Sequence, residues 1–277
     1  MACSSLRPYR VAAIGLVLVI SLWLAARALA PGPDWHTFYE ASRYLVRGQS
    51  PYLQKAFANP PWALIPALPI ALLLPEQLGR AAWFVAGIAG FAAVAYRLGA
   101  KPLSFGLFLA APTTTHNLLN GNIDWLPLLG FTLPPQIGLL LVVTKPQIGL
   151  GIAIYWMVEA YRNGGIRGFL RLVYPTALAY LFSFLLYGFW LTSYGVVYRT
   201  SVEWNASFWP YTIPLGIGLI AVGIVRRKAD WTYGAGPCLS PYVLFHVWNA
   251  LLISFLNRPW VLGSIVVALW ILVVGRL

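Results

Sequence analysis

Three separated polar clusters hold the residues that are best suited to chemistry. They lie at residues 34–47, at residues 116–124, and at Lys145 with Gln147. The chain is 60% hydrophobic and only 9% charged, and polar side chains are costly in such surroundings, so clusters of them indicate an aqueous site. Carboxylate, cationic and amide groups that converge near one membrane interface are able to bind a charged head group while the lipid part of a substrate stays in the bilayer.

The first cluster predicts an amphipathic helix. Its charged residues recur at spacings of four, three and four, which places them on one face of a helix. They are His36, Glu40, Arg43 and Arg47. Phe38, Ala41 and Leu45 lie opposite, so we expect the helix to lie in the membrane interface, with its charged face toward water. Gly48 and Pro51 are expected to end it.

Composition predicts an all-α, polytopic membrane protein with a single transmembrane domain at residues 1–277. The net charge of +12 is interpreted as basic residues that flank apolar segments, and no nucleic-acid partner is expected. Cys3 and Cys238 are far apart, so the sequence predicts neither a disulfide nor a zinc site.

The order of apolar segments predicts a topology. Residues 11–30 follow Arg7 and Arg10 and form the first span, with the N-terminus in the cytoplasm. An outer-face loop at residues 31–59 then carries the interfacial helix. Five prolines within residues 60–75 predict a re-entrant hairpin or a broken helix.

The remaining apolar segments bring the total to about ten spans, several of them short, tilted or half-membrane helices around a cavity. They are expected at residues 80–97, 103–119, 122–133, 136–144, 146–161, 172–190, 209–225, 239–255 and 261–274. An uncleaved basic N-terminus and an outer-face site suit a prokaryotic plasma membrane.

The outer-face loop resembles the first outer loop of family 87 glycosyltransferases, the polyprenyl-phosphate-mannose-dependent mannosyltransferases of the GT-C class. The shared spacing is D-x4-Y-x8-G-x2-PY, formed by Asp34, Tyr39, Gly48, Pro51 and Tyr52. The resemblance covers residues 34–171.

Three later motifs follow in the same order as in that family. Asn59 precedes the two prolines of a motif that resembles the family's YPP, and stands in place of its tyrosine. Gly121 and Asn122 resemble its G-Q-x-N element, with asparagine in place of glutamine, and the TKPQ sequence at residues 144–147 resembles its K-P element. The chain is shorter than typical members of the family.

The resemblance implies an inverting transfer of a hexose, with mannose as the expected sugar, from a polyprenyl-phosphate-sugar donor to a hydroxyl of a lipid or glycan acceptor. Asp34 would be the general base. Lys145 and one of Arg43 or Arg47 would hold the departing phosphate. Substrate contacts are assigned to Tyr39, His116, Asn120, Asn122, Asp124 and Gln147. The resemblance is compatible with a divalent metal, but no cofactor is predicted, because Asp34 with Glu40 or His36 is too small a ligand set for a metal.

Each site residue also has a structural interpretation. Asp34 and Asp124 are placed to cap helices, and capping is the favoured role for Asp124 but not for Asp34. His116 is interpreted as a capping or packing group, and His246 as a residue with local partners. Lys145 is either a snorkelling side chain or an intramembrane cation with a function, and the second is favoured.

A second hypothesis is a non-catalytic integral membrane subunit that packs in a larger protein complex and retains only the scaffold. An enzyme needs an open, lipid-accessible pocket lined by both Asp34 and Lys145, whereas a packing subunit is free to fill it. A transporter ranks last, because the sequence contains no internal repeat.

Overall fold

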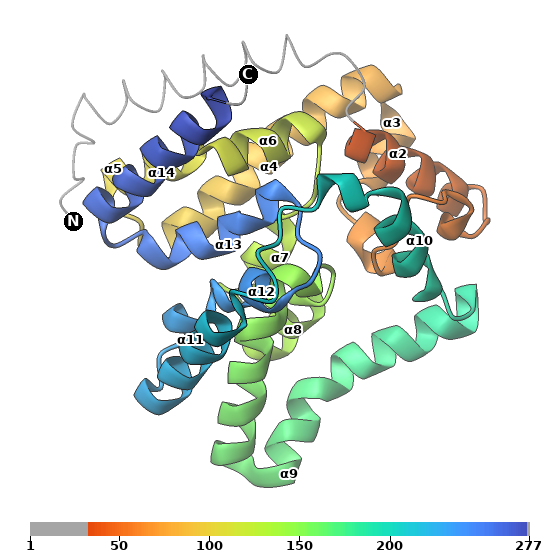
Figure 1. The fold of residues 1–277 in the computed structure, drawn as a ribbon. Coiled ribbons are helices and arrows are strands. Elements are labelled where there is room, and N and C mark those ends of the chain that lie inside the picture. The colour runs from red at the N-terminus through yellow and green to blue at the C-terminus, as the bar shows by residue number, and fades with distance from the viewer. Residues whose placement is uncertain (1–32, 276–277) are drawn as a thin grey trace, which may run out of the picture.

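The part of the chain that the structure describes is built from helices. A computed structural model describes residues 33–275, and no strand occurs within them. The α-helices (Figure 1) are α2 (Pro33–Val46), α3 (Leu68–Leu73), α4 (Glu76–Arg97), α5 (Pro102–Leu109), α6 (Pro112–Asn120), α7 (Trp125–Gly130), α8 (Pro135–Val142), α9 (Pro146–Tyr187), α10 (Thr192–Thr200), α11 (Ile213–Arg226), α12 (Ala235–Leu239), α13 (Asn249–Leu252) and α14 (Pro259–Val274). Short 3₁₀ turns are η1 (Pro51–Leu53), η2 (Pro61–Leu64), η3 (Val202–Trp204), η4 (Ala229–Thr232), η5 (Phe245–Trp248) and η6 (Ile253–Phe255).

The all-α prediction is confirmed for these residues. The first predicted span, residues 11–30, lies outside them, as do Arg7 and Arg10 and the predicted side of the N-terminus.

Prolines set the starts of several short helices. Proline has the φ of a helix and lacks an N–H that would be unpaired in the first turn. Because Pro112 begins α6 just after α5 ends, residues 103–119 form two helices and the single predicted span is wrong there. Residues 239–255, also predicted as one span, form η5, α13 and η6 instead. An eight-residue helix such as α5 is about 12 Å long, far less than a hydrocarbon core of about 30 Å.

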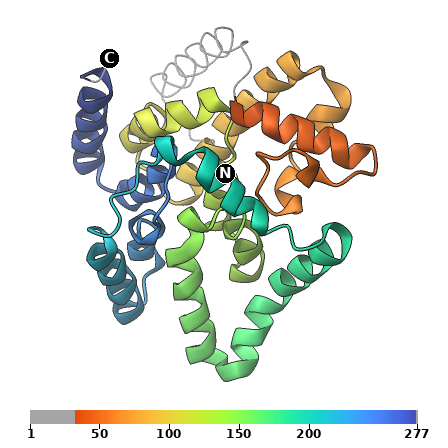
Figure 2. The same ribbon diagram turned by 45° about the vertical axis from the view of Figure 1, so that its right-hand side comes forward.

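Two of the described helices, α4 and α9, are long and apolar enough to cross a membrane. The 42-residue α9 bends at Gly165, whose φ of 56° and ψ of −149° suit glycine, and forms a V in Figures 1 and 2. Because Gly165 is not helical, the chain forms one helix on either side of it, which agrees with the two helices predicted at residues 146–161 and 172–190. The apolar helices α11 and α14 are shorter, so a total of ten spans is not confirmed.

The proline-rich stretch at residues 60–75 forms no long helix. Pro60 precedes η2, Pro69 lies in the first turn of the six-residue α3, and Pro75 precedes α4. This arrangement agrees with the predicted broken helix.

Helix α2 is amphipathic, as its spacing predicts. Trp35, Phe38 and Ala41 are buried, whereas His36 and Arg47 are exposed. The helix ends at Val46, and Gly48 follows with a left-handed φ of 71°. The α2 helix therefore turns its apolar face onto the rest of the protein.

Packed tryptophans hold α2 in place. The ring of Trp35 on α2 lies 5.3 Å from that of Trp83 on α4, and Trp83 lies 5.6 Å from Trp125 on α7, as measured between ring centroids. Large aromatic side chains that bury this much surface dominate the energetics of a core. The N-terminal ends of α2 and α7 are consequently fixed against the same helix, α4.

Large apolar side chains also face outward, notably on the second arm of α9, which projects from the helices around it in Figure 1. Phe182 is 59% exposed, Leu185 73% and Leu186 71%, and Ile271 on α14 is 67% exposed. Exposed apolar surface of this extent indicates contact with lipid or with another protein.

Candidate functional site

The site forms where α2 meets the loop between α6 and α7. Two side chains of α4 hold this loop: the Arg80 guanidinium donates to the carbonyl of Leu119 at 2.6 Å, and the Trp83 indole donates to the carbonyl of Gly121 at 2.8 Å. Gly121 ends α6 in a left-handed conformation, and a Cβ atom there would lie 2.6 Å from Cβ of Trp35. Glycine thus allows the loop to come close enough for Asn122 to reach Asp34.

We predict that Gly121→Ala destabilises the protein more than Gly48→Ala does. Both glycines are left-handed, so each substitution costs about 1–2 kcal/mol in backbone strain. Around Gly48 a new Cβ meets no atom within 4 Å, whereas at Gly121 it collides with Trp35 and adds about 1–3 kcal/mol. Thermal unfolding of both variants in the same detergent measures the difference, and equal losses would contradict the close approach.

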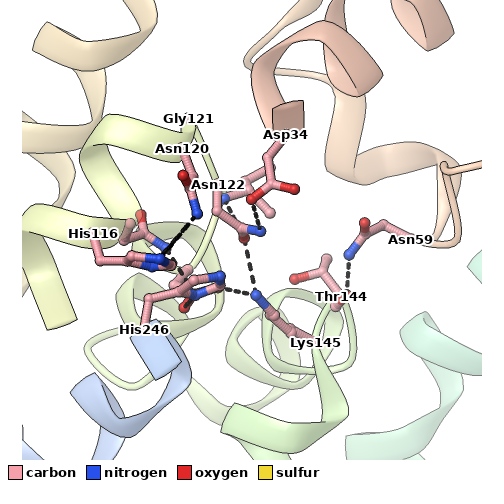
Figure 3. A network of polar contacts seen from close by, with 12 residues as sticks. Asp34, Asn59, His116, Asn120, Gly121, Asn122, Thr144, Lys145 and His246 are labelled. Carbon is pink, nitrogen blue, oxygen red and sulfur yellow. Dashed lines mark hydrogen bonds and ion pairs between the residues drawn. The ribbon is translucent and has the colours of Figure 1, made fainter. Parts of the chain in front are cut away.

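Asn122 links the two residues that the sequence identified as base and cation (Figure 3). Its Nδ2 donates to Oδ2 of Asp34 at 2.9 Å, and its Oδ1 accepts from Nζ of Lys145 at 2.9 Å. The same Oδ1 accepts from the backbone N–H of Ile123 at 2.7 Å, which fixes the orientation of the amide. The Asp34 carboxylate therefore accepts a hydrogen bond from a side chain outside α2. Within the described residues it accepts none from a backbone N–H of α2, so it does not cap that helix.

Lys145 lies at the junction between α8 and α9 and is only 8% exposed. Besides Asn122 it binds one carboxylate oxygen of Asp124, which is fully buried. A buried ammonium group requires such a partner, because an unpaired charge in the interior is strongly unfavourable.

Asp124 does not act as the helix cap that its position predicts. It precedes α7, but its side chain makes no capping hydrogen bond. One carboxylate oxygen binds Lys145, and the other lies 2.6 Å from Nδ1 of His246.

His246, in η5, is the residue that sequence reasoning missed. It was expected to have local partners, yet Asp124 is 122 positions away in the sequence. The imidazole is fully buried, and its ring stacks on that of His116 with centroids 5.6 Å apart. A lone histidine in an apolar stretch is a weak signal for a site, and no spacing rule connects it to a partner so distant.

A cavity of about 720 Å³ opens over this network. Its walls come from α2, residues 56–59, the α6–α7 loop, the start of α9, and α10 with η3. The predicted site residues that line it are Asp34, His116, Asn120, Asn122, Lys145 and Gln147. His246 also lines it, with the aromatic side chains of Tyr194, Tyr198 and Trp204. The cavity thus joins a polar floor to a largely aromatic and apolar wall.

Four predicted site residues do not line the cavity. Asp124 is fully buried, and the other three, Tyr39, Arg43 and Arg47, lie in or just after α2. Tyr39 donates to the carbonyl of Leu74 at 3.3 Å, and Arg43 donates to the carbonyl of Ala71 at 3.4 Å. Arg47 is exposed beyond the end of α2. Their helix face turns toward α3 and the surface, so the structure brings none of the three to Asp34 or Lys145.

No metal centre is formed by the residues that the structure describes. No three or more of their histidine, cysteine, aspartate and glutamate side chains gather closely enough to hold an ion. The polar groups that line the cavity are carboxylate, ammonium, amide and imidazole groups.

Comparisons with known proteins give no match: no protein-family model fits the chain, and neither a curated protein nor a solved structure resembles it significantly. The resemblance to family 87 glycosyltransferases rests on the sequence motifs alone. Function must accordingly be argued from the site.

Proposed function

We propose that this chain is an integral membrane glycosyltransferase of the GT-C type, which moves a hexose, with mannose as the expected sugar, from a polyprenyl-phosphate donor to an acceptor hydroxyl. The observation that carries this proposal is the convergence of Asp34 and Lys145 on one amide, that of Asn122, in the floor of an open cavity. The proposed base and the proposed cation lie on opposite sides of one small side chain. This arrangement suits a displacement reaction, in which a base acts on the attacking hydroxyl and a cation on the leaving oxygen.

In the proposed reaction Asp34 takes the proton of the acceptor hydroxyl as its oxygen attacks the anomeric carbon. The bond from that carbon to the phosphate oxygen breaks, and the polyprenyl phosphate leaves with the electron pair. Lys145, in a poorly hydrated site, stabilises the charge that develops on the leaving oxygen. Attack opposite the leaving group inverts the anomeric centre.

The charges around the cavity support a single phosphate site. Lys145 is the one lysine or arginine among the described residues that line the cavity, so phosphate binding falls to it and not to Arg43 or Arg47. Two of its three N–H groups bind Asn122 and Asp124, which leaves one for a phosphate oxygen.

The lipid part of the proposal rests on the surface. Two helices long enough to cross a bilayer and the exposed apolar side chains of α9 and α14 favour an integral membrane protein with lipid-accessible substrates. We place it in a prokaryotic plasma membrane with a cytoplasmic N-terminus and about ten spans or half-spans.

Sugar transfer by the purified full chain tests the proposal. With radiolabelled polyprenyl-phosphate mannose and lipids extracted from bacterial membranes, we expect label in a new glycolipid and an equal amount of polyprenyl phosphate. Mock-purified membranes without the chain are the control. If the folded protein transferred neither mannose nor glucose nor arabinose from such donors, the alternative of a non-catalytic subunit in a larger complex would take precedence.

A further inference from the structure

One nitrogen of a buried imidazole in the cavity has no role in the reaction described above. His246 is fully buried and lines the cavity, and its Nδ1 lies 2.6 Å from the Asp124 carboxylate. Its Nε2 is also buried and has no hydrogen-bond partner within residues 33–275. An unpaired buried polar atom is costly, so this nitrogen requires an explanation.

One carboxylate and one ammonium group lie beside His246 and balance each other in charge. Asp124 contributes one negative charge, and Lys145, bound to its other oxygen, contributes one positive charge. Asp34, a further carboxylate that lines the cavity, is bound to Asn122, and the neighbour stacked on the imidazole is another histidine, His116. A protonated His246 would add a second cation to a pair that is already balanced.

A neutral imidazole carries one proton and one lone pair. Because the carboxylate of Asp124 only accepts hydrogen bonds, the proton belongs on Nδ1 of His246 and the lone pair on Nε2. Nε2 of this cavity-lining residue is therefore a hydrogen-bond acceptor, and a buried carboxylate fixes the orientation of its ring.

We propose that Nε2 of His246 accepts a hydrogen bond from a hydroxyl group of the hexose, and so forms a sugar subsite beside the phosphate site at Lys145. This inference rests on the proposed function and names the group that recognises its sugar. Two further cavity residues have buried polar atoms without partners in the described chain, Oε1 of Gln147 and the hydroxyl of Tyr194. Several separate donors and acceptors of this kind match a ligand that carries hydroxyls around a ring.

The same atom discriminates between the two parts of the donor. A sugar hydroxyl has a proton to donate to a bare nitrogen, whereas a phosphate oxyanion has none and is repelled by the lone pair. The phosphate is consequently directed to the ammonium group of Lys145, and the sugar to His246.

Nitrogen NMR of the histidine rings tests the tautomer in the full chain. The chain has three histidines, His36, His116 and His246, so ¹⁵N-histidine labelling in lipid nanodiscs gives three ring patterns, which His116→Gln and His246→Gln assign. At pH 7.5 we expect a proton on Nδ1 of His246 and a bare Nε2. A doubly protonated ring, or a proton on Nε2 alone, would overturn the inference.

Two soluble probes then test the ligand. Citronellyl phosphate mannose, a short-chain donor, is expected to shift the Nε2 resonance of His246 toward its hydrogen-bonded value, whereas citronellyl phosphate without the sugar is expected to leave it in place. No shift with the mannose probe, or equal shifts with both probes, would remove the sugar subsite.

The outcome is separable from that of the transfer assay. Transfer of sugar without any change at Nε2 would leave the proposed function standing and this inference refuted. A change at Nε2 that needs the sugar, in a protein that transfers none, would support the subsite and refute the transferase.

Discussion

Asp34→Asn is expected to lower the initial rate of sugar transfer by about 10²–10⁴-fold, the usual contribution of a general base. Asparagine keeps the size of the side chain, and its carbonyl oxygen still accepts the hydrogen bond that Asn122 donates at 2.9 Å. The substitution therefore removes the ability to take a proton while it leaves the floor of the cavity in place. Initial rates with labelled polyprenyl-phosphate mannose, at equal amounts of folded protein, measure the loss.

Glu40→Gln is the matched control for Asp34→Asn. It makes the same change of carboxylate to amide on the same helix, at a half-buried position that does not line the cavity. We expect its rate to stay within about twofold of the wild type, since substitutions away from a site change little. A full rate for Asp34→Asn would exclude Asp34 as the base, and equal losses in both variants would attribute the defect to α2 as a whole.

The sequence predicts local structure well where a periodic pattern determines it. The α2 helix, its buried face and its end near Gly48 follow from spacing alone, because a helix of this composition has one way to bury its apolar side. Spans are harder to predict, since apolar runs do not reveal where a helix is interrupted. Pro112 divides one predicted span, whereas Gly165 separates two helices that the sequence already predicts as separate.

Part of the site can be predicted from the sequence, and there is a physical reason why the rest cannot. Asp34, Asn122 and Lys145 belong to motifs, so their convergence is expected from the resemblance. The pairing of Asp124 with His246 depends on how α7 and η5 pack, and residues 122 positions apart give no periodic signal. Arg43 shows a second limit of the sequence. A helical spacing predicts which residues share a face but not what that face contacts, and Arg43 contacts the carbonyl of Ala71.

The buried pair of Asp124 and Lys145 provides the largest expected effect on stability. Asp124→Asn leaves the Lys145 ammonium, 8% exposed, without its carboxylate, and we expect a loss of about 3–5 kcal/mol. Lys145→Met leaves a fully buried carboxylate with His246 as its remaining partner and is expected to cost a similar amount. Thermal unfolding followed by tryptophan fluorescence in one detergent measures both losses.

The double variant separates charge burial from other effects of the two substitutions. In Asp124→Asn with Lys145→Met no unpaired charge remains, so it should be more stable than either single variant, as found when buried ion pairs are replaced together. Glu159→Gln is the control for simple loss of an ion pair: its partner Arg162, 3.0 Å away, is partly exposed, and the expected cost is about 0–1 kcal/mol. If the double variant lost as much stability as the two single variants together, Asp124 and Lys145 would stabilise the protein independently.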